Sequence, residues 1–115
     1  MTDAGTTIEF DDFVKVEIRT GTIIEAKLNP KARVPAYELS IDFGALGLRK
    51  SSAQLTENYT SEELIGKQIV AVVNFEPKRV AGVKSEVLVL GAVCDKAGVV
   101  LLEPTFPTVN GMPIA

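Results

Sequence analysis

Hydrophobic and polar positions alternate most regularly over residues 37–43, YELSIDF, where every second side chain is apolar. This period of two is typical of a strand with one face in a core, and it places Ile41 on the inward face. Residues 15–28 are rich in β-branched side chains and predict a longer strand before it. Gly21 interrupts that strand, and a glycine there is expected to mark a bulge or a sharp bend.

The other apolar runs are shorter. Residues 67–75 are apolar at most positions, so both faces of this strand are expected to be buried, with Val72 facing the core. Residues 8–14 predict a short helical turn. The tail, residues 103–115, is too apolar for a free end and is expected to pack on the domain or on a second subunit. Further strands are predicted at 48–55, 86–90 and 99–102.

A short helix is predicted over residues 59–66, between the third and fourth strands. Thr60 suits the N-cap, Glu63 completes a capping box, and Gly66 suits a left-handed residue after the last turn. Three strands, a short helix and two strands is the order of an OB-fold, a five-stranded Greek-key barrel. We therefore expect a mainly all-β chain, one OB-fold domain over residues 1–115 with a loose arm at 1–7. A β-sandwich with scattered surface lysines is the alternative.

Basic residues gather in two of the predicted loops, although the net charge is −3. In an OB-fold, the loops after the first and fourth strands border the ligand face. Here these loops are residues 29–35 and 76–85, and they hold five of the 12 basic residues against one acid, Glu76. The pattern predicts an anion-binding face, and the usual anion for such barrels is nucleic acid. The alternative is a solvated hairpin whose lysines only aid solubility. The five basic residues are Lys31, Arg33, Lys78, Arg79 and Lys84.

Composition excludes much enzyme chemistry. The chain has no histidine, so it cannot form a Ser-His-Asp or Cys-His nucleophile or a His-ligated zinc site. It has no phosphate-binding glycine motif, and no apolar run near the ~18 residues of a membrane helix. Cys94 is the single cysteine and is expected to be a buried or half-buried hydrophobe in a cytoplasmic protein. We expect a non-catalytic protein with no cofactor and no metal.

Several stretches resemble the tRNA-binding OB-fold family, which includes dimeric tRNA-binding proteins and the C-terminal domain of many methionyl-tRNA synthetases. The most specific is the NFxPxxxxGxxSE pattern at residues 74–86, and the resemblance covers roughly residues 10–115. VPAYEL, SSAQ and KSEVLVLG most resemble the CsaA branch, small bacterial proteins described as secretion chaperones. Val87-Leu88 stand where the family commonly has Gly-Met. Asn29 and Arg33-Val34 replace a histidine and an Asp-Lys pair of the first loop.

The resemblance implies a homodimer that binds the outside corner of tRNA by shape. The implied contacts come from side chains that can meet a phosphate, a 2′-OH or a base edge. An alternative role for Asn74 is to close the strand end by bonding its own loop, and for Ser85 it is a turn cap. Gly82 is expected to be a turn glycine with positive φ. The implied tRNA contacts are Arg33, Gln54, Asn74, Lys78, Arg79, Lys84 and Ser85.

The CsaA resemblance also implies a second function, a passive protein-export chaperone that binds unfolded preproteins. Its partners would be unfolded preproteins or the export machinery. The apolar groove would use Phe75, Val80, Phe106 and Met112. The two functions are compatible on one face. A third alternative is a domain that only dimerises and docks onto a partner protein.

Overall fold

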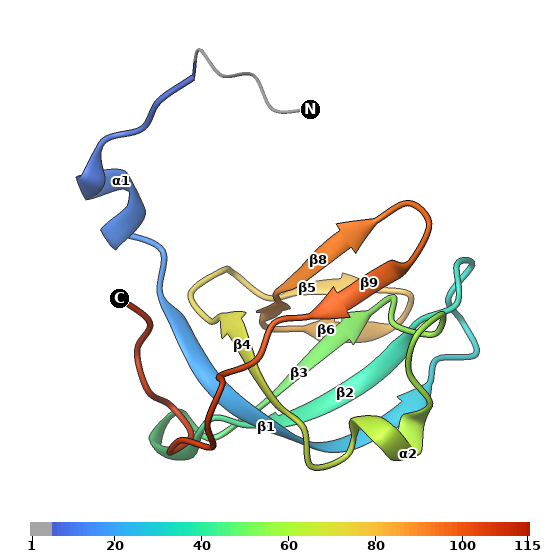
Figure 1. Ribbon diagram of the computed structural model, residues 1–115. Coiled ribbons are helices and arrows are strands. Elements are labelled where there is room, and N and C mark those ends of the chain that lie inside the picture. Colours follow the sequence, from blue (N-terminus) through green and yellow to red (C-terminus); the bar gives the residue numbers. More distant parts are fainter. Residues whose placement is uncertain (1–5) are drawn as a thin grey trace.

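The computed structural model describes residues 6–115, which form a nearly closed antiparallel β-barrel (Figure 1). Five strands make one sheet in the order β3-β2-β1-β4-β7, and every pairing is antiparallel. The edges approach each other where the Glu86 N–H donates to the Lys50 carbonyl at 2.8 Å. The OB-fold barrel expected from the sequence is confirmed. Its strands are β1 (Ile18–Leu28), β2 (Tyr37–Asp42), β3 (Leu48–Ala53), β4 (Gln68–Val72) and β7 (Leu88–Val89).

Smaller elements surround this barrel. The predicted helical turns are confirmed as α1 (Phe10–Val14) and α2 (Ser61–Leu64), and a 3-10 turn, η1 (Gly44–Leu46), joins β2 to β3. Two small hairpins differ from the prediction: residues 76–85 contain strands rather than only loop, and the partner of the strand at 99–102 was missed. These hairpins pair β5 (Lys78–Val80) with β6 (Val83–Ser85), and β8 (Gly91–Cys94) with β9 (Gly98–Leu101).

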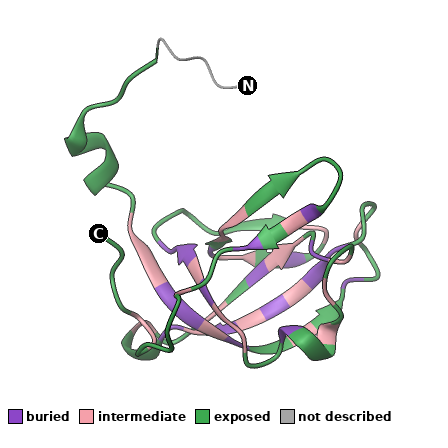
Figure 2. Cartoon of the chain, viewed as in Figure 1, coloured by how far each residue is buried: buried purple, intermediate pink, exposed green. Residues whose placement is uncertain are grey.

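The core lies inside the barrel, where Figure 2 shows the buried bands of the strands. Along β2, Tyr37, Leu39 and Ile41 are buried and alternate with half-buried neighbours, as the period of two predicts. The prediction for Val72 was wrong. Val72 is buried but lies outside the core cluster, because Ala71 and Val73 occupy the inward positions on either side of it.

Gly21 has a different role from the one expected. It pairs regularly with Ile69 of β4, and the irregularity in β1 lies instead between Ile23 and Glu25. A Cβ on Gly21 would lie 2.8 Å from both Ile41 Cγ2 and Phe43 Cδ1. Glycine is therefore needed here because two core side chains cross over the strand, not because the backbone bends.

Replacing Gly21 by alanine should destabilise the barrel by about 1–3 kcal/mol, since the new methyl overpacks a filled core. The measurement is urea unfolding followed by circular dichroism. The companion variant Gly21→Ala with Phe43→Leu removes part of the obstructing ring, so the two changes should be less than additive. Equal stability of Gly21→Ala and the parent would mean that the core side chains can move aside at no cost.

The capping signals of α2 are confirmed. The Thr60 hydroxyl accepts from the Glu63 N–H at 3.2 Å, and the Thr60 N–H donates to the Glu63 carboxylate at 2.9 Å. The backbone hydrogen bond from Thr60, assisted by its hydroxyl, lowers the pKa of Glu63. Gly66 has φ +92°, the left-handed conformation expected after the helix. This short helix thus depends on its caps, and it supplies one fully buried residue, Leu64.

The tail runs beside the first half of β1. The Gly111 N–H donates to the Thr20 carbonyl at 2.7 Å, the Thr20 N–H donates to the Met112 carbonyl at 3.0 Å, and the Ile114 N–H donates to the Ile18 carbonyl at 2.9 Å. The tail backbone is thus fastened to the barrel, while the Phe106 side chain remains 78% exposed. At the other end of the chain, α1 stands away from the barrel (Figure 1).

The environment of Cys94 contradicts the expectation of a buried thiol. Cys94 is exposed, because β8 belongs to a hairpin that projects from the barrel rather than to the barrel wall. Within residues 6–115 no helix is long and apolar enough to span a membrane. The arm predicted at residues 1–7 falls mostly outside the described residues.

Candidate nucleic-acid interface

The two basic loops of the sequence lie against each other, and Asn29 joins them. Its side-chain amide donates to the Ala81 carbonyl at 3.2 Å, and its Oδ1 accepts from the Lys31 N–H at 3.0 Å. Asn29 is 7% exposed, so this contact is shielded from water. A bond that reaches across 52 residues of sequence therefore fixes the loop after β1 to the turn of the β5–β6 hairpin.

The β5–β6 hairpin closes with a two-residue turn, Ala81-Gly82, in which φ is +49° and +85°. Positive φ at both central residues is typical of the type I′ turn that matches the twist of a hairpin. The expectation for Gly82 is confirmed. Alternation along the strands then divides the side chains, since Val83 is buried on one face while Arg79 and Lys84 are exposed on the other.

Three cations converge around this turn, and we call Lys31, Arg79 and Lys84 the cation cluster. Arg79 and Lys84 face each other directly across the two strands. The Arg79 guanidinium donates to the Gly82 carbonyl at 3.0 Å, and the Lys31 side chain lies over the same glycine, with its Cδ 3.2 Å from where a Cβ would stand. No ion pair among residues 6–115 involves these three side chains. Like charges placed opposite each other are destabilising on their own, so the cluster favours binding of an anion.

A pocket of about 460 Å³ lies on the other side of the hairpin, and we call it the rim pocket. Lys78 and Ser85, paired across the hairpin, line it together with Phe75 and Leu88. Ser85 sits within β6, opposite Lys78, rather than at the turn where a cap would lie. The rim pocket thus brings a cation and a hydroxyl beside exposed apolar side chains.

A second pocket, of about 320 Å³, lies between the loop after β1 and the end of β3. It unites two residues of the predicted tRNA site, Arg33 and Gln54, with Val80 of the predicted peptide site. Lys31 lines the same pocket, so it is continuous with the cation cluster. Six of the seven predicted tRNA contacts therefore lie in or beside the two basic loops.

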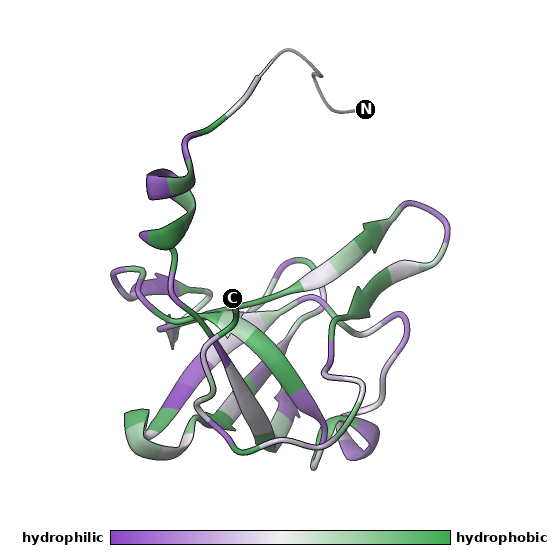
Figure 3. Cartoon of the chain, turned by 60° about the vertical axis from the view of Figure 1, so that its left-hand side comes forward, coloured by the Kyte–Doolittle hydropathy of each residue, from purple (hydrophilic) through white to green (hydrophobic). Residues whose placement is uncertain are grey.

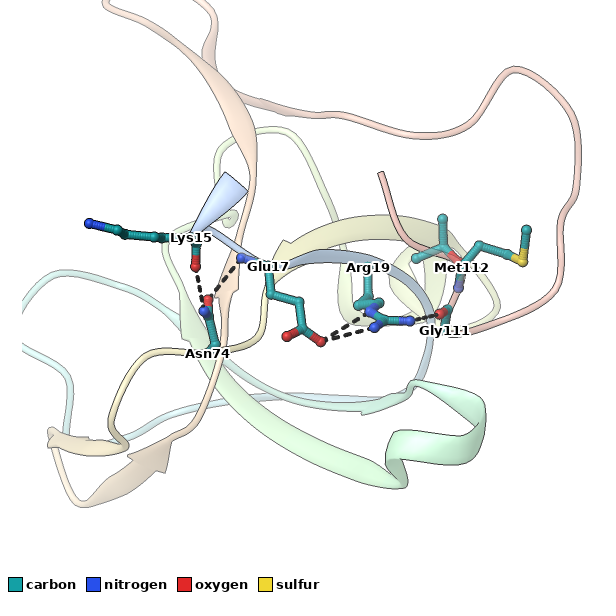
Figure 4. A network of polar contacts seen from close by, with 7 residues as sticks. Lys15, Glu17, Arg19, Asn74, Gly111 and Met112 are labelled. Carbon is teal, nitrogen blue, oxygen red and sulfur yellow. Dashed lines mark hydrogen bonds and ion pairs between the residues drawn. The ribbon is translucent and has the colours of Figure 1, made fainter. Parts of the chain in front are cut away.

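Asn74 is the seventh predicted tRNA contact, and its side chain is hydrogen-bonded to the protein backbone (Figure 4). Its Nδ2 donates to the Lys15 carbonyl at 2.7 Å and its Oδ1 accepts from the Glu17 N–H at 3.0 Å. Asn74 closes a strand end through the segment before β1, and not through its own loop. Glu17 continues the network to Arg19, whose guanidinium donates to the Gly111 carbonyl at 2.9 Å. The start of the basic loop is thereby fastened to both terminal segments.

The four residues of the predicted peptide groove lie in different places. Phe75 lines the rim pocket and Val80 lines the second pocket, whereas Phe106 and Met112 belong to the tail. Outside these regions, Val93 on the β8–β9 hairpin is 82% exposed, the highest fraction among the large apolar side chains of residues 6–115. Figure 3 shows hydrophobic segments along both strands of this hairpin and in α1. The chain therefore presents apolar surface at several separate sites.

Sequence reasoning identified the basic loops but missed how they are joined. It gave Asn29 no role and counted Lys31 only as a basic residue. The available signal was an asparagine directly after a strand and before Pro30, a setting in which the side chain commonly bonds the backbone two residues on. That signal predicts the bond to Lys31, but the contact with Ala81 depends on the folded barrel.

Residues 18–113 match the tRNA-binding domain family, whose model is described as "Putative tRNA binding domain". A methionine–tRNA ligase of Methanococcoides burtonii is 38% identical over 90% of this chain, which spans 15% of that ligase. The crystal structure of the chaperone CsaA from Bacillus anthracis is 55% identical, with a TM-score of 0.91 over 96% of this chain and 100% of that one. CsaA from Picrophilus torridus is 49% identical, with a TM-score of 0.89 over 95% and 100% of the two chains. The chain belongs to the tRNA-binding domain family, in which it is similar to CsaA proteins in both sequence and fold.

Proposed function

We propose that the chain is a non-catalytic, cytoplasmic tRNA-binding protein that acts as a homodimer and recognises the outside corner of tRNA by its shape. The observation that carries this proposal is the cation cluster, three basic side chains held together without a carboxylate partner in residues 6–115. Such a cluster attracts backbone phosphates, which position a nucleic acid without reading its sequence. Arg33, Gln54, Lys78 and Ser85 are proposed as flanking contacts, and Asn74 as the residue that holds the loop.

The proposed dimer is supported by apolar side chains that this chain leaves uncovered. Phe10 on α1 is 75% exposed and Val109 on the tail is 72% exposed. Exposed apolar side chains of this kind are typical of interfaces. A second copy that covers α1 and the tail would place two cation clusters in one particle and double the number of phosphate contacts.

Fluorescence anisotropy with labelled bulk tRNA tests the proposal, with titrations at low and at physiological salt. Saturable binding that weakens with salt is expected, because about three to five phosphate contacts per subunit give a log–log slope of several units. Single-stranded RNA should compete poorly. Absence of binding even at low salt would refute the function, and sedimentation equilibrium of the free protein tests the homodimer separately.

A second candidate function is passive holding of unfolded preproteins. The similarity to CsaA proteins, whose structures are described as chaperones, supports it, as does exposed apolar surface such as Val93. Binding should depend on the apolar content of the peptide and little on salt. If unfolded apolar peptides give no saturable signal in low or high salt, this function is excluded.

A further inference from the structure

The rim pocket has features that a plain phosphate site does not need. Two of its walls are apolar side chains in contact with solvent, Phe75 at 57% exposed and Leu88 at 51% exposed. Its lining also includes Val87, which is 4% exposed. The volume of about 460 Å³ falls within the roughly 300–1,000 Å³ typical of small-ligand sites. An aromatic ring and an aliphatic side chain in one pocket suit a flat apolar group.

The charges of the rim pocket are mixed. Glu76 and Glu86 line it together with Lys78. Two carboxylates repel a phosphate, so this pocket differs from the cation cluster on the outer face of the same hairpin. Carboxylates accept hydrogen bonds from the amino groups of bases, as when an acidic side chain accepts from cytosine N4.

Glu86 is the better placed of the two carboxylates because it is fixed to the barrel. Its backbone N–H donates to the Lys50 carbonyl at 2.8 Å, and its Oε1 accepts from the Lys50 N–H at 3.0 Å. One carboxylate oxygen is thereby held by β3, and Oε2 remains to accept a bond from a ligand. An acceptor anchored in this way loses little side-chain entropy on binding.

The cation cluster lies immediately beside this pocket in sequence and space. Lys78 and Ser85, which line the pocket, are adjacent to Arg79 and Lys84, which face outward. An RNA strand that crosses the hairpin can therefore place phosphates on the outer face and turn one base inward. Recognition of single-stranded bases by stacking and edge hydrogen bonds is the usual way in which proteins read RNA loops.

We propose that the rim pocket binds one unpaired nucleobase that carries an exocyclic amino group. The base lies between Phe75 and Leu88, Glu86 Oε2 accepts from its amino group, and Lys78 meets a flanking phosphate. This inference rests on the proposed tRNA-binding function and assigns a base-reading site to it. Adenine, guanine and cytosine satisfy the requirement, and uracil does not, because it lacks the amino donor.

One variant and a matched control test the assignment on tRNA. Phe75→Ala removes the stacking surface without opening the core and should weaken tRNA binding by about 5- to 150-fold, the range for loss of one stacked base. The slope of affinity against salt should stay the same, because no phosphate contact is removed. Ile65→Ala, an exposed apolar side chain of similar exposure (52%) at the end of α2, should bind as the parent does. Unchanged affinity of Phe75→Ala, or a change in its salt slope alone, would overturn the assignment.

Mononucleotides test the base preference without tRNA. In a titration followed by NMR, cytidine monophosphate should shift the Phe75 ring and Leu88 methyl signals saturably, whereas uridine monophosphate should bind several-fold more weakly. Glu86→Gln replaces Oε2 with an amide NH₂ and should abolish this preference.

The combined outcomes separate this inference from the proposed function. If cytidine monophosphate binds in the pocket but tRNA does not bind, the tRNA-binding function is refuted and the base site is supported. If tRNA binds but cytidine monophosphate causes no shifts, the base site is refuted and the tRNA-binding function is supported. Shifts produced by an apolar peptide but not by either nucleotide would overturn the base site in favour of a peptide pocket.

Discussion

Reversing Arg79 and Lys84 together to glutamate should reduce tRNA affinity on the order of 100-fold or more at physiological salt. The two side chains face each other on the outer surface of the β5–β6 hairpin, and with Lys31 they form the cation cluster. Removing two phosphate contacts should also lower the log–log salt slope by about two units per subunit. The barrel should remain folded, because both side chains are exposed and the double variant replaces a pair of positive charges with a pair of negative charges.

The matched control for this experiment is Lys27→Glu with Lys96→Glu. Both double variants are four units more negative than the parent net charge of −3, so a general charge effect would weaken both equally. Lys27 lies near the end of β1 and Lys96 in the turn between β8 and β9, and both are exposed. The measurement is tRNA anisotropy across a salt series, with thermal melting as the check on folding. Equal binding by parent and Arg79→Glu/Lys84→Glu would remove the cation cluster from the site.

The loops that carry the charges could be predicted because loop order in a barrel follows from strand order. The alternation at residues 37–43, together with the capping pair Thr60 and Glu63, was enough to place the helix between the third and fourth strands. The internal form of residues 76–85 could not be predicted. Its strands have three residues each, too few for a periodic signal, and Ala81 occupies a positive-φ position more typical of glycine or asparagine.

Gly21 and Asn74 show the limit of sequence reasoning more sharply. A glycine in a strand signals either a bend or a close approach, and only the positions of Ile41 and Phe43 decide between them. Asn74 has the chemistry of an RNA contact, yet its amide is bonded to the backbone of Lys15 and Glu17. Both outcomes depend on residues at least 20 positions away, which a local pattern does not reveal.

The two faces of the β5–β6 hairpin carry different sets of side chains. Pairing in register puts Arg79 with Lys84 on one face and Lys78 with Ser85 on the other. A shift of one residue in register would mix these sets, because side chains alternate along a strand. The Asn29 bond to Ala81 and the buried Val83 hold the hairpin against the barrel. The proposed phosphate contacts of Arg79 and Lys84 and the proposed base contacts in the rim pocket can thus be changed independently by mutation.

Replacing Ile41 by aspartate should unfold the protein at room temperature. Ile41 is fully buried on the inward face of β2, within the core cluster. The change loses about 2–5 kcal/mol of packing and adds several kcal/mol for an unpaired buried charge, against a typical total stability of about 5–15 kcal/mol. Circular dichroism melting measures the effect. Leu28→Asp places an aspartate at a residue of β1 that is 59% exposed, and this variant should melt near the parent.

A graded series separates the buried charge from the loss of volume. Ile41→Val should lower the free energy of unfolding by only about 0.5–1.5 kcal/mol, since it deletes one methyl group. The loss caused by Ile41→Asp should therefore be much larger than the loss caused by apolar truncation. Val72 provides a further comparison, because it is buried outside the core cluster and pairs with Leu88 between β4 and β7. Ile41→Asp melting within a few degrees of the parent would mean that Ile41 does not point into the barrel. The inward face of β2 would then have to be reassigned to Glu38, Ser40 and Asp42.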